Sequence, residues 1–205
     1  MSIPIRTLFA GAAIVLASHA VPASAQNASF TAIRDAVPAR YFDPDTTAPD
    51  PGNANTLVIG LHASEPFRAS AEVANTTGTR LATDTLSVVV SAPAGFYVSS
   101  VTCHLSGRGT VNTPADARAS ANCVINGTPE DLGSVGGAKF TSTGADWSLS
   151  SKTATFSESS TAAIPVSLTA QLFAFAAPAL ASAEIDLTSA TIVVTVSPST
   201  ASPRH

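Results

Sequence analysis

Charged residues are scarce in this 205-residue sequence, at 12% of positions, and no basic run occurs along it. Nucleic-acid binding depends largely on Lys and Arg contacts to phosphates, so we expect no nucleic-acid partner. The low charge comes with 45% hydrophobic residues. A disordered chain has the opposite composition, poor in apolar residues and rich in charge, so the sequence predicts a folded protein.

Catalytic motifs are also missing. We find no G-x-S-x-G elbow, no H-E-x-x-H pair and no phosphate-binding loop. Beyond the N-terminal segment, His62 and His104 are the only histidines before the last residue. We therefore assign no catalytic residue and expect a protein that is not an enzyme. A secreted hydrolase that uses one of these histidines stays an alternative.

Long hydrophobic runs are absent, and the longest candidate near the N-terminus is too short for a membrane span. Arg6 precedes an apolar stretch at residues 8–17, and Ala23-Ser24-Ala25 follows it. This is the order of a secretory signal, with cleavage expected before Gln26, whereas a bilayer span needs roughly 20 apolar residues. We expect residues 1–25 to be removed. The mature chain would be secreted, extracellular or periplasmic, from a bacterium, with no transmembrane segment.

Cysteine is rare, and both cysteines lie in the mature chain, at Cys103 and Cys123. In an oxidising compartment an isolated pair of this kind predicts one disulfide. The alternative is a two-cysteine metal site completed by histidines, for which His62, His104 and His205 are available.

Alternation of apolar and polar residues dominates the sequence from residue 56 onward. Turn signals recur at intervals of roughly ten residues, which is typical of an antiparallel β-sandwich. We predict an all-β fold, Ig-like or jelly-roll, with about 8–11 strands over residues 56–197. Residues 26–55 are expected to be irregular and to contain a Pro/Asp-rich loop, and residues 198–205 to form a disordered tail. The single Trp, Trp147, is expected to plug the core between the sheets.

Two details of the last strands can be predicted. Residues 164–172 alternate as a half-buried strand, and Pro165 near its start favours a position at a sheet edge, since proline has no backbone N–H to donate. In the final strand the apolar positions shift from odd to even numbers near Thr188 and Ser189. A β-bulge there would restore a common inward face.

A cluster of oxygen ligands in the N-terminal loop is the best metal candidate. Calcium prefers six to eight oxygen ligands, which close-set carboxylates and amides supply. The spacing does not fit the EF-hand pattern, and the alternative is a solvated turn in which these side chains bond to local backbone groups. The weak calcium candidates are Asp43, Asp45, Asp50, Asn53 and Asn55.

Two segments are candidates for partner binding. If the disulfide pins residues 104–122 at their base, they form a protruding loop with net positive charge, or else an exposed hairpin tip. The apolar run at residues 173–180 is expected to connect two strands. It either exposes a hydrophobic patch for a partner or folds onto the end of the core. The weak candidates are His104, Arg108 and Arg118 in the first segment, and Phe173, Phe175 and Leu180 in the second.

The Ser/Thr/Ala-rich composition, the expected disulfide and the β-rich ending at residues 191–196 resemble bacterial fimbrial or spore-coat-U-like secreted subunits. The C-terminal aromatic residue of chaperone–usher pilins is absent, so no residue role is transferred. We predict a surface, matrix or filament component with a structural or adhesive role, which associates with itself or with other surface proteins. An extracellular glycan- or calcium-dependent binding module is the alternative.

Overall fold

The computed structural model describes residues 27–33, 40–73, 77–112, 114–159, 163–177 and 181–200. These residues form twelve strands and one short 3-10 helix, Gly137–Lys139, and their strand pairs are antiparallel. The predicted β-sandwich is confirmed, with one strand more than expected. Among the described residues, no helix is long and apolar enough to cross a membrane.

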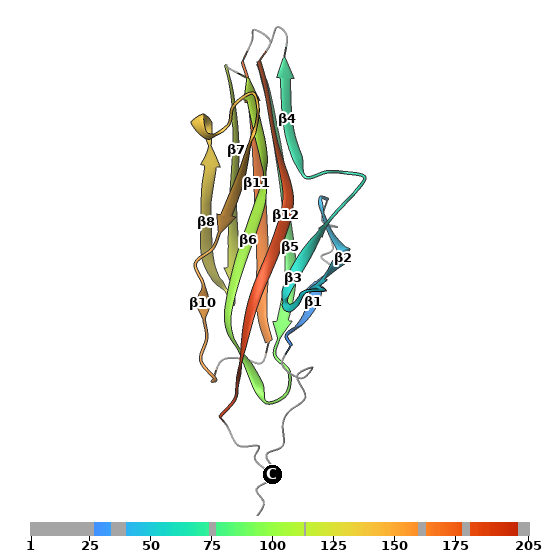
Figure 1. Cartoon of the computed structure of the whole chain (residues 1–205), viewed down its shortest axis with the longest axis vertical. Helices are drawn as coiled ribbons and strands as arrows, with labels where there is room; N and C mark the ends of the chain where they lie inside the picture. The colour runs from blue at the N-terminus through green and yellow to red at the C-terminus, as the bar shows by residue number, and fades with distance from the viewer. Residues whose placement is uncertain are drawn as a thin grey trace, which may run out of the picture.

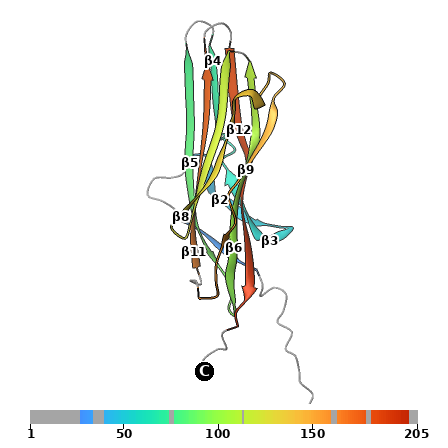
Figure 2. The ribbon, with the colours of Figure 1, turned by 90° about the vertical axis from the view of Figure 1, so that its left-hand side faces the viewer.

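Two sheets face each other in a long, narrow sandwich (Figures 1 and 2). The five-stranded sheet has the order β1 (Ser29–Ile33), β5 (Gly78–Ser91), β11 (Ala163–Ala176), β7 (Ala115–Ile125), β8 (Thr128–Gly136). The seven-stranded sheet has the order β10 (Ala154–Thr155), β6 (Phe96–Asn112), β12 (Ala181–Pro198), β3 (Asn53–Leu61), β2 (Phe42–Asp50), with β4 (Arg68–Val73) on β12 and β9 (Ala145–Ser150) on β6. The sandwich is long because β12 has 18 residues, which span about 60 Å at the rise of a strand.

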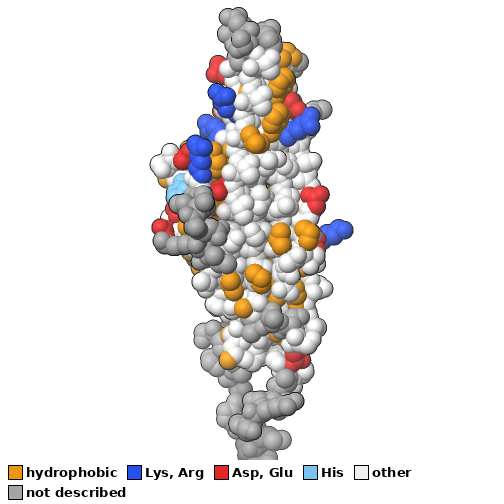
Figure 3. Space-filling model, turned by 180° about the vertical axis from the view of Figure 1, so that it is seen from behind, with side chains coloured by type: hydrophobic (Ala, Val, Ile, Leu, Met, Phe, Trp, Pro, Cys, Tyr) orange, Lys and Arg blue, Asp and Glu red, His pale blue; other side chains and the backbone are white. Residues whose placement is uncertain are grey.

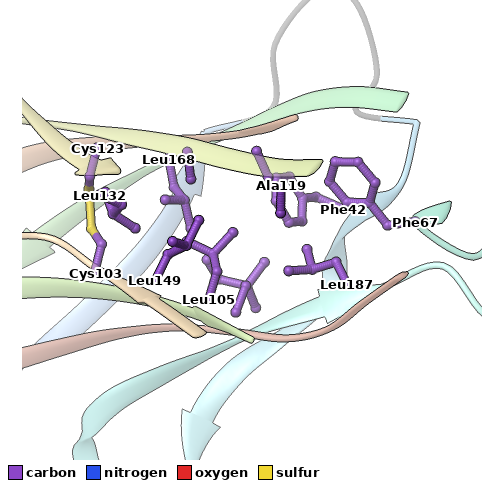
Figure 4. Packing of buried hydrophobic residues seen from close by; sticks show 14 of the residues in the cluster. Phe42, Phe67, Cys103, Leu105, Ala119, Cys123, Leu132, Leu149, Leu168 and Leu187 are labelled. Atoms are coloured by element: carbon purple, nitrogen blue, oxygen red, sulfur yellow. A yellow bond between two sulfur atoms is a disulfide. The ribbon is translucent and has the colours of Figure 1, made fainter. Parts of the chain in front are cut away.

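Alternate residues of both sheets fill the core. In β11, for example, every second side chain from Ile164 to Ala176 is buried. Figure 4 shows Leu105, Leu149, Leu168 and other apolar side chains meeting between the two sheets. Trp147 is 3% exposed and is therefore the core residue that we predicted.

The disulfide between Cys103 and Cys123 is confirmed, and the metal-pair alternative is wrong. Cys103 lies in β6 of one sheet and Cys123 in β7 of the other, so the bond links the two sheets (Figure 4). The prediction that residues 104–122 protrude as a loop is also wrong. Most of them continue β6 and β7, because their alternating small and apolar side chains have a core to cover.

The N-terminal region is more regular than we expected. Residues 29–33 form β1, and residues 42–50 form β2 where we predicted a Pro/Asp-rich loop. Strand β2 accommodates Pro44 and Pro49 because it lies at an edge of the seven-stranded sheet, where a missing N–H breaks no ladder. The sandwich therefore begins well before residue 56. The predicted signal peptide, residues 1–25, lies outside the described residues.

At the other end of the chain, β12 extends to Pro198, and the backbone N–H of Ser199 donates to the Gly95 carbonyl at 2.8 Å. The predicted disordered tail is wrong for these residues, and residues 201–205 lie outside the described part. The predicted bulge in β12 is confirmed, since its register against β6 shifts between Leu187 and Ser189.

The expected edge position of Pro165 is wrong, because β11 is the central strand of its sheet. Pro165 pairs with Val89 of β5, and its carbonyl accepts the N–H of Asn126, the residue that follows β7. In a strand the nitrogen and the carbonyl of one residue point to the same side. The proline nitrogen therefore faces the turn after β7, where no ladder bond is lost.

Candidate functional site on the five-stranded sheet

The outer face of the five-stranded sheet carries side chains from β5, β11, β7 and β8 in cross-strand rows. Since strand residues alternate between faces, the register decides which side chains become neighbours. One row joins Leu81, Phe173 and Arg118, and the next joins Thr83, Gln171, Ser120 and Ser134. Chain segments up to about ninety residues apart in sequence therefore meet on one surface.

These two rows surround a shallow hollow of about 340 Å³, here called the platform hollow. Phe173 is half-buried and lies between its neighbours Leu81 and Arg118 in the first row. Leu81 is 58% exposed, which is unusual for a large aliphatic side chain. The lining residues are Leu81, Arg118, Ser120, Ser134, Gln171 and Phe173.

Two polar side chains of the platform hollow have hydrogen-bond partners on the same face. The Nε of Arg118 donates to Oδ2 of Asp116 at 2.7 Å, which holds the guanidinium beside the aromatic ring. The Nε2 of Gln171 lies 3.4 Å from Oγ1 of Thr83. The hollow thus combines an apolar platform with amide, hydroxyl and guanidinium donors.

Further along the sheet the same face is nearly free of charge. Thr85 and Thr169 share a hydroxyl–hydroxyl bond of 2.9 Å, and the Ser87 hydroxyl donates to that of Ser167 at 3.2 Å. Figure 3 looks onto this face, where hydrophobic side chains gather in the upper part, with Lys or Arg nearby on both sides. The upper part therefore differs chemically from the hydroxyl-rich middle.

The predicted partner-binding residues are divided between the two sheets. Phe173 and Phe175 belong to β11 itself and face outward, so they neither connect strands nor fold onto the core end. Arg118 joins them on this face, whereas Leu180 lies outside the described residues. His104 and Arg108 lie on the outer face of the seven-stranded sheet.

On that opposite face, Nδ1 of His104 is 2.7 Å from the Ser150 hydroxyl. Arg108 forms an ion pair with Asp146 at 3.2 Å and donates to the Thr143 carbonyl. Among the described residues, no carboxylate forms an ion pair with His104, so the His–Ser contact lacks the third group of a catalytic triad.

The calcium candidates do not converge on one point. Asp43 accepts bonds from the Asp45 N–H and the Thr46 hydroxyl, and both bonds lower the pKa of its carboxyl, the Thr46 bond more strongly. Asp50 accepts the Gly52 N–H, and the Asn53 and Asn55 side chains accept the N–H groups of Asn55 and Ala28. Except for the bond between Ala28 and Asn55, which joins residues 27 apart in sequence, these are the local bonds of the solvated-turn alternative. Within the described ranges, no group of three or more His, Cys, Asp or Glu could hold a metal ion.

Sequence reasoning missed Leu81, Ser120, Ser134 and Gln171 as site residues. The usable signal was the alternation of β11, which places the odd-numbered residues from Pro165 to Gln171 on one face. Extended by four residues, it places Phe173 and Phe175 there too. The neighbours on β5, β7 and β8 could not be found in this way, because they depend on strand order and register.

The fold and the hollow define this chain as a β-sandwich with a polar–aromatic surface on one sheet. No family model matches the chain, and no curated protein matches it. It is structurally similar to a CBM61 carbohydrate-binding module solved in complex with β-1,4-galactotriose, with 11% identity, a TM-score of 0.24, and coverage of 85% of this chain and 92% of that one. A CBM4 structure has 12% identity and a TM-score of 0.21, with 59% of this chain and 71% of the other covered. We therefore base the functional proposal on the side chains of the hollow.

Proposed function

We propose that the protein is an exported, non-catalytic glycan-binding module that holds a sugar chain on the outer face of its five-stranded sheet. The observation that carries the proposal is the platform hollow, where the half-buried Phe173 lies between Leu81 and Arg118 beside Gln171. The signal-like residues 1–25 support a location outside the cytoplasm, where such ligands occur.

The chemistry of a sugar matches this surface. A pyranose ring has a C–H face that packs on an aromatic ring, and a rim of hydroxyls that donate and accept hydrogen bonds. Phe173 supplies the ring, and the exposed Leu81 extends the apolar surface. Arg118, Gln171 and the two serines supply the polar contacts that orient a ligand.

The lining of the hollow supports a proposal of binding without cleavage. None of the six lining residues is Asp, Glu or His. Glycoside hydrolysis generally uses two carboxyl groups about 5–10 Å apart on either side of the scissile bond. The nearest carboxylate along β7, Asp116, is engaged with Arg118. The hollow therefore suits recognition of a glycan and not its hydrolysis.

A glycan array, read with and without EDTA, tests the proposal. We expect binding in both conditions and a loss of about tenfold or more for Phe173→Ala, which corresponds to about 1.4 kcal/mol. Val58→Ala is the matched apolar control, since Val58 is 39% exposed but lies on β3 of the other sheet. Arg118→Ala should likewise weaken binding, and Arg108→Ala is its matched control on the other sheet. No binding to any glycan, or equal losses for Phe173→Ala and Val58→Ala, would contradict the proposal.

A structural role through self-association is the second candidate. It is favoured by the exposure of Leu81 beside the half-buried Phe173 and Phe175, an apolar surface that a second copy could cover. Sedimentation of the mature chain at increasing concentration separates the two roles. A strictly monomeric wild type removes the structural candidate. A dimer that Phe173→Ser dissociates supports it.

A further inference from the structure

A second hollow adjoins the platform hollow across Leu81, which lines both. It measures about 400 Å³ and is here called the arginine hollow. Arginines from three separate segments line it, at Arg40, Arg68 and Arg80, together with Glu65 and Ser70. In Figure 3 a cluster of Lys or Arg side chains lies on one side of the upper hydrophobic surface.

Two of the three arginines already have carboxylate partners. Arg40 binds Glu65 through Nε at 2.6 Å, and its guanidinium lies 5.1 Å from the centre of the Tyr41 ring. Arg68 binds Asp186 at 2.5 Å and lies 3.6 Å from Glu184. The pKa of each guanidinium is raised, mainly by the hydrogen bond to Glu65 and to Asp186 respectively.

Arg80 differs from the other arginines of the described chain. Arg40, Arg68, Arg108 and Arg118 each form an ion pair, but no described carboxylate pairs with Arg80. Within the described part of the chain, its Nη1 donates to the Thr79 carbonyl at 3.1 Å. Its fork of donors is thus available for an anion in the arginine hollow.

We propose that the arginine hollow binds the anionic substituent of an acidic polysaccharide, a uronate carboxylate or a sulfate ester. This inference rests on the proposed function, and it names the ligand class. A sugar ring on Phe173 would place the next sugar of the polysaccharide near Leu81. Arg80 would then donate to the charged group of that sugar. Guanidinium recognises such planar or tetrahedral anions through paired N–H donors. The charges of Arg40 and Arg68 are balanced by their carboxylate partners, so the unpaired positive charge of Arg80 would favour one docking position.

The test uses the mature protein and three soluble polymers of similar length: polygalacturonate, which carries only carboxylates, λ-carrageenan, which carries only sulfate esters, and neutral galactan. Affinity is measured at low and at high NaCl concentration. We expect the wild type to prefer one or both acidic polymers at least fivefold, with a preference that salt weakens. Arg80→Gln should bring the affinity for that polymer down to the neutral level, and Arg80→Lys should restore part of it. The two acidic polymers distinguish a carboxylate from a sulfate ligand.

Arg108→Gln is the matched control, since Arg108 is also exposed but lies on β6 of the opposite sheet. It should leave all affinities unchanged. Equal binding of neutral and acidic polymers, or unchanged acidic binding in Arg80→Gln, would overturn the inference and leave the glycan-binding function in place. If none of the three polymers binds, the inference is also overturned. The glycan array then tests the glycan-binding function separately. Thermal melting of each variant checks that it is folded.

Discussion

Replacing Cys103 and Cys123 together with alanine removes the covalent link between the two sheets. The cysteines are 20 residues apart in sequence. For a loop of this size, the chain-entropy relation gives an entropy loss in the unfolded state of about 11 cal/mol/K, or about 3 kcal/mol at 25 °C. For a chain of this length, a loss of that size corresponds to a decrease in Tm of about 6–12 °C. Both sulfurs are fully buried, so the alanine variant also loses packing.

Urea unfolding followed by Trp147 fluorescence measures this loss. Trp147 is the single tryptophan and is 3% exposed, so its emission reports the opening of the core. Reduced wild type separates the two contributions, because it lacks the bond but keeps both sulfurs. We expect reduction to lower the free energy of unfolding by about 3 kcal/mol, and the double alanine variant to lower it further. If oxidised and reduced wild type unfold at the same urea concentration, the reasoning is refuted.

Three further predictions concern the sandwich itself. Gly107→Ala should prevent folding to a soluble protein, as judged by circular dichroism, because a Cβ there would overlap a backbone oxygen and lie 2.6 Å from the Trp147 ring. Leu168→Ala should cost about 2–5 kcal/mol in urea unfolding, since Leu168 is fully buried in the central strand; a loss below 1 kcal/mol would contradict its placement. Asp43→Ala should lower stability at neutral pH. The Thr46 hydroxyl and a backbone N–H lower the folded-state pKa of Asp43 below its ordinary 3.8, so its contribution is present above that value and is lost as pH falls through the folded-state pKa. Unfolding curves of wild type and variant should therefore approach each other in acid, and a constant difference would count against this role.

Local patterns predicted much of the fold. The alternation of residues 164–172 identified the strand, and the phase shift at Thr188 and Ser189 identified the bulge, because side chains of a strand alternate with a period of two. The two cysteines predicted their bond, since a pair in an exported chain has few other uses. The edge position inferred from Pro165 was wrong, because proline is disfavoured only where a neighbouring strand offers a carbonyl to the missing N–H. The end of β7, which removes that partner, is not visible along β11.

The candidate site was only partly predictable. Phe173, Phe175 and Arg118 were predicted as weak partner-binding candidates, but they were assigned to a connection and a loop. Their meeting with Leu81 depends on β11 lying between β5 and β7 in one particular register. His104 and Arg108 show the reverse case, since they belong to the same disulfide-closed segment as Arg118 but face outward from the other sheet.

Export, an all-β architecture and the disulfide were therefore inferred from the amino-acid sequence by itself, and the structure confirms the latter two. Each depends on features that are local in the chain: an apolar run with small residues after it, a period of two, and a pair of cysteines. Only the tertiary structure decided that Leu81, Phe173 and Arg118 form one row, and that Arg80 lines the adjoining hollow without a carboxylate partner among the described residues. The physical reason is that strand order and register bring distant segments together. Strand order and register are determined by the packing of the whole core and not by any single segment.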